Sequence, residues 1–251
     1  MKSAAMQNLF FPVLVTFTTI LVSFCAHAGE PLFTAEYEGK YSGLTITSTR
    51  QLEQLDNGKF QLNSVIKNSF ASITEESQFT FDEGIMVPQS YHYKRKILAF
   101  KADENFRFDW PKATVYYERE DKPEKNREFP LELGVLDPAL YQLQVQRAVA
   151  AGHTKIDVTF VKSSKIKTLH FKKTGEETLQ LGDKSYQSIL VERDNRDDDK
   201  ETRLWIVPDL NYQIARVEHV EENGDKHSIR LTSYKSSANL SKVLYTAAKA
   251  Q

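Results

Sequence analysis

The feature that most constrains this chain is residues 201–221, where two alternating runs flank a Pro-Asp-Leu-Asn segment at 208–211. Leu204 and Ile206 enclose Trp205, and a similar alternation resumes after the turn. A period of two is typical of strands with one buried and one wetter face. Proline fixes φ and asparagine tolerates unusual backbone angles, so the intervening segment predicts a turn. We therefore expect an antiparallel hairpin with the Trp205 indole in the protein core.

The same alternation recurs along most of the chain, between turn signals at residues 56–58, 82–84, 182–183 and 222–225. Roughly twelve strands at such intervals are typical of an open barrel or a sandwich. We predict a mainly β protein, with a single antiparallel sheet curved into an open or incomplete barrel. The charged run 119–128 is expected to be a solvated turn, and 166–172 and 176–181 are expected to be separate strands.

One helix interrupts this pattern. Asp137 is suited to the N-cap, Pro138 to the first helical position, and Gly152 to the position just past the end. These signals predict a helix over about 137–151, and its broad apolar surface predicts packing against the sheet. The segment 236–251 is expected to be a weakly ordered, partly helical tail, which leaves 29–235 as a single β-rich domain.

The first 28 residues predict a secretory signal peptide, with an apolar run from Leu9 to Phe24 and an Ala-His-Ala site before Gly29. An uncleaved anchor is the alternative, but the run of roughly 16 residues is shorter than the ~20 that a spanning helix needs. A lipoprotein would use Cys25, which the bulky Phe24 makes a poor cleavage site. We expect a periplasmic protein without a stable membrane span after cleavage.

Composition excludes several classes of site. Cys25 is the only cysteine, so the cleaved chain would have no disulfide, cysteine-zinc site or thiol nucleophile. Basic and acidic residues number 33 and 34, and a near-neutral chain of interspersed signs is not built for nucleic-acid binding.

Five segments in a fixed order resemble a known family. They are Leu-Gly-Val-Leu-Asp-Pro-Ala-Leu-Tyr-Gln-Leu-Gln from 133, Gly-Glu-Glu-Thr-Leu from 175, Val-Glu-Arg-Asp from 191, Leu-Trp-Ile-Val-Pro-Asp-Leu-Asn-Tyr from 204 and Leu-Thr-Ser-Tyr from 231. Together they resemble the bacterial family catalogued as domain of unknown function 3108, over nearly all of the chain from Phe33 to Tyr234. The resemblance implies a secreted, β-rich protein of Gram-negative envelopes. It implies no established activity and no catalytic residues.

The sequence predicts neither a metal site nor a cofactor. No His-Glu-x-x-His pair is present; His219 and His227 flank one turn and could form a fortuitous site, although ordinary strand histidines are the simpler interpretation. A calcium site would use Asp194, 197–199 and Glu201, but the glycine of a calcium loop is missing.

Catalytic signatures are also missing. The sequence has no Gly-x-Ser-x-Gly elbow, phosphate-binding glycine loop or dinucleotide fingerprint. We therefore expect no enzyme, although a carboxylate pair acting on envelope glycans is a remaining alternative.

Aromatic side chains could line an apolar groove on the curved sheet. The candidates are Tyr91, Tyr93, Phe106, Phe108, Trp205 and Tyr212. The alternative is that these rings simply fill the core. The sequence thus favours binding of a lipid-like, apolar or amphiphilic ligand, with a cell-envelope protein-interaction module as the second hypothesis.

Overall fold

The computed structural model describes residues 30–41, 43–163, 165–194 and 200–245. The expected signal peptide at 1–28 lies outside them. The strands are β1 (Phe33–Tyr41), β2 (Leu44–Gln54), β3 (Phe60–Lys67), β4 (Ala71–Asp82), β5 (Ile85–Ile97), β6 (Phe100–Asp109), β7 (Thr114–Arg119), β8 (Arg127–Pro130), β9 (Lys155–Lys162), β10 (Lys165–Leu181), β11 (Lys184–Arg193), β12 (Glu201–Val207), β13 (Gln213–Val220) and β14 (Lys226–Ser236). The helices are α1 (Leu140–Ala150) and α2 (Leu240–Tyr245), with short 3-10 turns η1 (Pro123–Lys125) and η2 (Pro208–Leu210).

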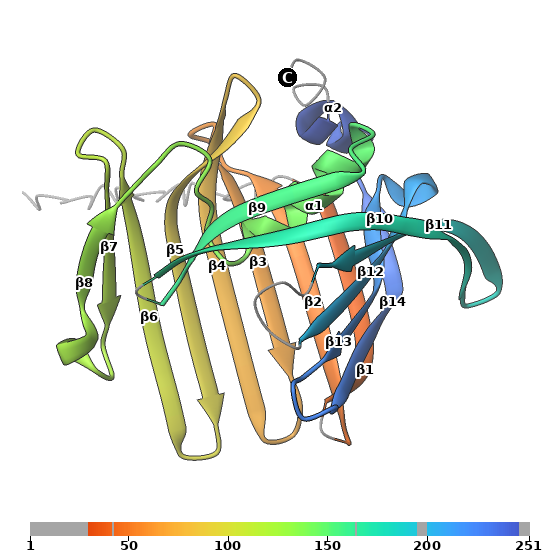
Figure 1. Ribbon diagram of the computed structural model, residues 1–251, viewed down its shortest axis with the longest axis horizontal. Helices are drawn as coiled ribbons and strands as arrows, with labels where there is room; N and C mark the ends of the chain where they lie inside the picture. Colours follow the sequence, from red (N-terminus) through yellow and green to blue (C-terminus); the bar gives the residue numbers. More distant parts are fainter. Residues whose placement is uncertain (1–29, 42, 164, 195–199, 246–251) are drawn as a thin grey trace, which may run out of the picture.

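All fourteen described strands form one antiparallel sheet, in the order β8-β7-β6-β5-β4-β3-β2-β1-β14-β13-β12-β11-β10-β9. It consists of two meanders, β1–β8 and β9–β14, which join where β1 pairs with β14. The sheet does not close, because β8 and β9 are its two ends. Figure 1 shows the long strands β2–β6 as a wall, with β9 and β10 crossing in front of it. The predicted incomplete antiparallel barrel is confirmed.

Helix α1 occupies the space between this wall and β9. Arg50 on β2 donates to Gln142 of the helix (2.8 Å), and Ser77 on β4 donates to Asp137 just before it (2.5 Å). On the other side, Leu136 forms a parallel bridge with Phe160 of β9. The sheet therefore curves around a helical plug, and the main apolar core fills the space between them.

The start of α1 differs slightly from the prediction. The helix begins at Leu140 and its formal cap is Ala139, so Pro138 lies just before the first turn. The Asp137 carboxylate still accepts the N–H groups of Ala139 (2.8 Å) and Leu140 (3.0 Å), as a capping side chain does. Gly152 follows the helix with φ +88°, the left-handed conformation that glycine adopts without strain.

Two other elements differ from the prediction. The charged run contains η1 and the start of β8. Strand β8 forms there because its backbone pairs with β7, which does not require apolar side chains. Residues 165–181 form one strand, in which the register shifts between Lys173 and Gly175 instead of breaking. Within the tail expected to be partly helical, the structure describes α2, whose Leu240 and Leu244 are buried.

Gly39 lies where the two meanders join. A Cβ added to it would sit 2.0 Å from the carbonyl oxygen of Ser228 and 2.7 Å from the Cα of Ile229 on β14. Only a residue without a side chain allows this approach. The N-terminal strand is thus fitted closely to the last strand of the chain.

Candidate functional site

The six aromatic candidates do not gather around one groove. Tyr91, Phe106, Phe108 and Trp205 are buried, whereas Tyr93 and Tyr212 are half-buried. The rings of Tyr91 and Phe106 lie 5.7 Å apart, and their contacts belong to the core between β5, β6 and β7.

Trp205 and Tyr212 lie elsewhere in the fold. The Trp205 indole donates to Glu177 (2.8 Å), and the guanidinium of Arg216 stacks 4.4 Å from its ring. Tyr212 has φ +55° just after η2, and its ring contacts Tyr245 of α2. Among the described residues, neither ring forms an aromatic pair with the other four candidates.

A buried polar cluster lies under the start of α1. Tyr91 donates to Glu75 (2.6 Å), next to the Ser77–Asp137 pair. Burial raises the pKa of Glu75, although the hydrogen bond from Tyr91 and the charge of Arg50 oppose the rise. Burial also raises the pKa of Asp137 to about 7, against the opposing effect of its hydrogen bonds. Both carboxylates thus serve contacts inside the fold.

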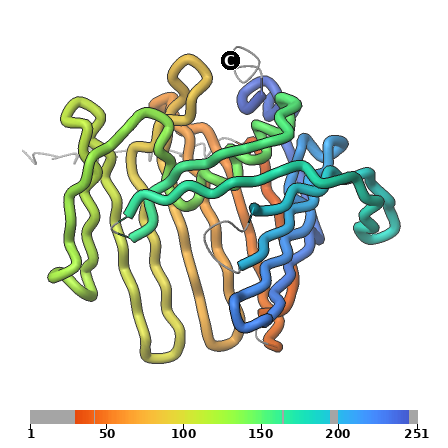
Figure 2. Tube along the Cα trace, in the orientation of Figure 1, coloured from red at the N-terminus to blue at the C-terminus, as the bar shows by residue number. Residues whose placement is uncertain are grey.

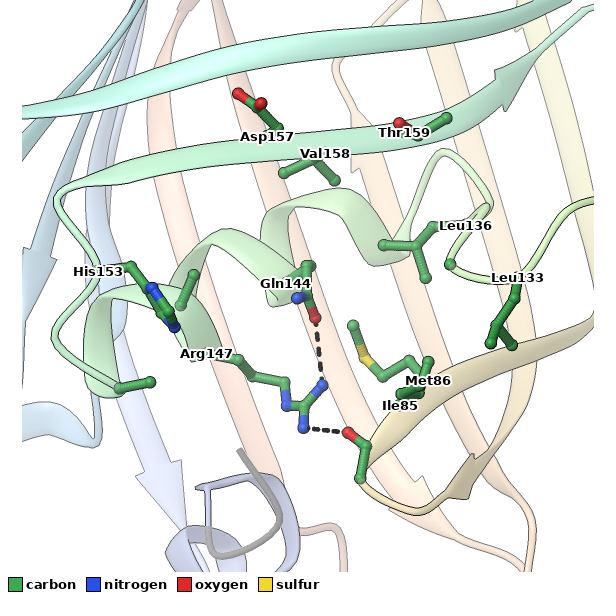
Figure 3. Close-up of a pocket in the computed structure, with 14 residues that line it drawn as sticks. Ile85, Met86, Leu133, Leu136, Gln144, Arg147, His153, Asp157, Val158 and Thr159 are labelled. Atoms are coloured by element: carbon green, nitrogen blue, oxygen red, sulfur yellow. Dashed lines mark hydrogen bonds between the residues drawn. The ribbon is translucent and has the colours of Figure 1, made fainter. Parts of the chain in front are cut away.

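A cavity of about 360 Å³ lies on the opposite side of α1, between the helix, the β4–β5 turn, β9 and the loop before the helix (Figure 3). This volume falls within the ~300–1,000 Å³ typical of small-molecule sites. Apolar side chains supply much of its wall, namely Ile85, Met86, Leu133, Leu136, Ala148 and Val158. The polar lining includes Gln144, Arg147, His153, Asp157 and Thr159.

Arg147 is the buried cation of this cavity, with 3% of its surface exposed. Its guanidinium donates to the carbonyl oxygens of Leu244 (2.8 Å) and Gly84 (2.5 Å) and to the side chain of Gln144 (3.1 Å). All three acceptors are neutral, and among the described residues no carboxylate forms an ion pair with Arg147. Burial lowers the pKa of this group, as expected for a cation taken out of water.

Arg50 provides a contrast. It is also buried, and it donates to Gln142 and to the carbonyl of Ala139. Its charge acts on the buried Glu75, which supplies a nearby countercharge. Burying a cation without a countercharge is costly. The site at Arg147 is therefore electrostatically suited to an anionic group, whereas the site at Arg50 is already balanced.

The remaining polar residues lie toward the mouth of the cavity. His153 and Asp157 are exposed, and Asp157 pairs with His170 on β10 (2.7 Å). Val158 points from β9 toward α1, and Asp157 and Thr159 point the other way, as alternation along a strand requires (Figure 3). The cavity lining thus combines apolar side chains with one buried cation, and its acidic residue, Asp157, is exposed.

The histidine pair suggested by the sequence does come together. His219 and His227 are direct partners across β13 and β14. His219 contacts Thr202 (2.9 Å) and Glu221 (3.4 Å), and burial lowers its pKa. Among the described residues, no group of three or more His, Cys, Asp or Glu side chains could hold a metal ion. Residues 197–199 of the possible calcium cluster lie outside the described chain.

Sequence reasoning missed Arg147. One signal was available: an arginine stands beside Val145, Ala148 and Val149 on the apolar part of the predicted helix. That position predicts either a buried cation or a side chain that reaches the surface along its aliphatic stem. The sequence alone does not tell which of the two occurs.

No helix within the described ranges has the length and apolar character required to cross a bilayer. A comparison with curated proteins finds no match.

A comparison with solved structures finds the "Crystal Structure of Beta-barrel-like Protein of Domain of Unknown Function DUF1849 from Brucella abortus". The TM-score is 0.52 at 11% identity, covering 82% of this chain and 98% of the other. At that identity the likeness shows a shared fold, and it agrees with the open barrel described above. The family model described as "Protein of unknown function (DUF3108)" matches residues 36–232. The chain therefore belongs to the DUF3108 family.

Proposed function

We propose that this protein binds an amphiphilic ligand with an anionic head and an apolar tail in the cavity beside α1. The observation that supports this most directly is Arg147, a buried cation whose partners within the described chain are all neutral. An anionic head would supply the missing countercharge through charge-assisted hydrogen bonds. Ile85, Leu136 and Val158 would cover the apolar tail.

The proposed site replaces the aromatic groove as the location of binding but keeps the class of ligand. The interior of the barrel is occupied by α1 and the buried core, so little space is left there for an acyl chain. The cavity beside α1 combines apolar side chains with the buried Arg147, and its exposed side carries His153 and Asp157. This arrangement suits a carrier or receptor, and it motivates the proposal of a non-enzymatic protein.

The two other hypotheses have less support. A protein-interaction module would pair through a free strand edge, but β8 has four residues and ends at Pro130, which protects an edge. At the other end, Leu136 already exchanges hydrogen bonds with Thr159 and Val161 of β9. A glycan-acting enzyme would need a converging pair of carboxylates in a cleft, and the buried Glu75 and Asp137 do not line the cavity.

We further propose that the protein acts in the periplasm, because residues 1–28 have the sequence pattern of a secretory signal peptide. Native mass spectrometry of protein released from the periplasm without detergent tests both proposals. The expected mass corresponds to a chain beginning at Gly29, with a bound amphiphile. An intact chain beginning at Met1 in the membrane fraction would contradict the location without bearing on the cavity.

Two variants on one helix test the cavity in vitro. Ala148 lines the cavity, whereas Ala150 is not among the lining residues. Ala148→Leu should fill part of the space and weaken dodecanoate binding at least about tenfold, since new bulk is poorly accommodated at a packed site. The matched variant Ala150→Leu should bind within about twofold of wild type, because a steric effect requires contact. Equal effects of the two changes, or no binding by the wild type, would overturn the proposal.

The head group is tested with a pair of ligands. Arg147→Gln should weaken the binding of dodecanoate by about tenfold or more, because a hydrogen bond to a charged group contributes roughly 1.5–3 kcal/mol. The affinity for dodecanol, which lacks the charge, should fall much less. Isothermal titration calorimetry measures both ligands, and circular dichroism verifies that the variant is folded. An equal loss for both ligands would show that Arg147 supports only the shape of the site.

A further inference from the structure

A second feature lies at the opposite end of strand β5. Exposed large apolar side chains gather at the turns between β3 and β4 and between β5 and β6. We call this set the apolar tip, and it consists of Phe70, Ile97, Leu98 and Phe100. The exposed fractions of Phe70, Leu98 and Phe100 are 58%, 66% and 75%. The two turns contact each other, because the Leu98 N–H donates to the Phe70 carbonyl (3.1 Å).

The tip belongs to one edge of the molecule. In an antiparallel meander, alternate turns lie at the same end, so the β1–β2, β3–β4 and β5–β6 connections share an edge (Figure 2). Tyr41 and Leu44, which flank the first of these connections, are exposed as well. Six of the eight exposed large apolar side chains among the described residues therefore lie along this edge. Such clustering marks an interaction site more often than scattered exposure does.

Basic side chains border the tip. The segment 94–101 reads Lys-Arg-Lys-Ile-Leu-Ala-Phe-Lys and contains no acidic residue. Lys96 on β5 lies directly opposite Lys101 on β6. On its other side it lies opposite Ser72 on β4, which in turn lies opposite Lys67 on β3, so the three lysines belong to one row across the strands. Within the described chain these three lysines form no ion pair, whereas Lys94 pairs with Asp103 (3.4 Å). Like charges directly opposite each other destabilise a sheet, so an external anionic surface would relieve this row.

The backbone at the tip provides a second argument. Leu98 has φ +51°, a left-handed conformation that costs a side chain with a Cβ roughly 1–2 kcal/mol and is easier for Gly or Asn. The turn thus holds an exposed apolar residue in the left-handed conformation, at an energetic cost and without burying it. Packing inside the fold does not account for this choice of residue.

We propose that the apolar tip docks onto an anionic lipid membrane surface. Phe70, Leu98 and Phe100 would enter the interface between head groups and acyl chains, and the lysine row would contact the anionic head groups. Two protruding turns with basic flanks fit a deformable, negatively charged surface. This inference goes beyond the proposed ligand cavity and does not depend on it.

Vesicle co-sedimentation tests the docking. Wild-type protein should bind vesicles of phosphatidylethanolamine and phosphatidylglycerol, bind phosphatidylcholine vesicles weakly, and detach as salt rises. Leu98→Asn combined with Phe100→Ser should weaken binding at least about tenfold. Asparagine adopts positive φ readily, so this variant should remain folded. Replacing Lys96 and Lys101 by Gln should remove most of the preference for phosphatidylglycerol.

The matched control is Ile166→Asn, because Ile166 is also an exposed large apolar residue (39%) but lies on β10, away from the tip and outside the cavity lining. It should bind vesicles as the wild type does. The proposal is overturned if wild-type protein does not bind anionic vesicles, or if Ile166→Asn weakens binding as much as the tip variant. It is also overturned if sedimentation equilibrium shows a tip-dependent dimer that no longer binds vesicles, since the tip would then contact a second copy of the chain.

Discussion

Among single residues, Asp137 makes the strongest link between sequence and stability. Its side chain holds the first turn of α1 and accepts a hydrogen bond from Ser77, and it is completely buried. The sequence predicts the capping role, because Asp-Pro before an apolar run is a helix start signal. The burial depends on β4 lying beside the helix, which no local pattern specifies. The capping role of Asp137 can therefore be predicted from the sequence, whereas its raised pKa cannot.

We predict that Asp137 makes stability fall as pH rises. Its pKa is about 7 in the folded chain and 3.8 for an ordinary aspartate. Below pH 4 both states are protonated, and the stabilising contribution is complete. Between pH 4 and 7 only the folded state retains the proton, so stability declines with a slope of up to about 1.4 kcal/mol per pH unit. Above pH 7 the contribution is lost.

The measurement is urea denaturation of wild type and Asp137→Asn at intervals from pH 4 to 8. The amide keeps the shape of the side chain and does not titrate, so wild type should lose stability relative to this variant by a few kcal/mol across the range. Asp183→Asn, on the exposed β10–β11 turn, controls for simple removal of a carboxylate. A difference between wild type and Asp137→Asn that is constant with pH would contradict the prediction.

At the scale of elements, predictability followed the strength of local signals. Alternation and turn residues predicted most of the hairpins. Three residues typical of helix ends, Asp137, Pro138 and Gly152, predicted α1. The short helix α2 has only one such signal, Asn239 before its first residue, and it buries Leu240 and Leu244 against the rest of the fold. Strand β10 was divided in the prediction, because a sequence does not distinguish a bulge at Gly175 from the end of a strand.

The candidate site was less predictable than the fold. Aromatic content led to a predicted class of ligand, which stays a prediction, whereas the position of the cavity depends on which face of the sheet α1 covers. That choice places Tyr91 and Phe106 in the core and Arg147 beside open space. Contacts of α1 with Arg50 on β2 and with Gly84 in the β4–β5 turn join distant parts of the chain, and local periodicity carries no information about them.

The pairing of β1 with β14 leads to a prediction about glycine. Gly39→Ala should destabilise the protein by roughly 1–3 kcal/mol or more, because its Cβ would overlap the backbone of Ser228 and Ile229. Gly175→Ala is the matched control, since no atom lies within 4 Å of the position of its Cβ and its φ is not in the positive range. Chemical denaturation compares the two. Equal destabilisation would show that the close approach does not limit the residue at 39.

At the scale of the whole molecule, the two proposed sites lie at opposite ends of β5. Gly84 and Ile85 line the cavity at its first end, and Ile97 and Leu98 form the apolar tip at its other end. A strand of 13 residues spans about 40 Å at ~3.4 Å per residue. A molecule docked through its tip would thus hold the cavity well away from the lipid surface, so a bound ligand would be presented to the aqueous side.

The two meanders also predict how the molecule folds. Each consists of contacts between neighbouring strands, whereas β1 and β14 pair residues as distant as Phe33 and Ser236. Contacts of long sequence separation form late, because a large loop must first be closed. Gly39→Ala should therefore accelerate unfolding and leave the folding rate nearly unchanged in stopped-flow experiments. A folding rate lowered by the full loss of stability would show that β1 and β14 pair early.

The late pairing of β1 and β14 has a consequence during synthesis. A growing chain presents its N-terminal end first, so β1 exists long before β14 has been made. Until then one edge of β1 has unpaired backbone groups, and such edges promote association with other chains. The last strand therefore acts as the chain's own protection against aggregation, and a ribosome that stops before Lys226 would release a product with two unprotected edges, on β1 and β13.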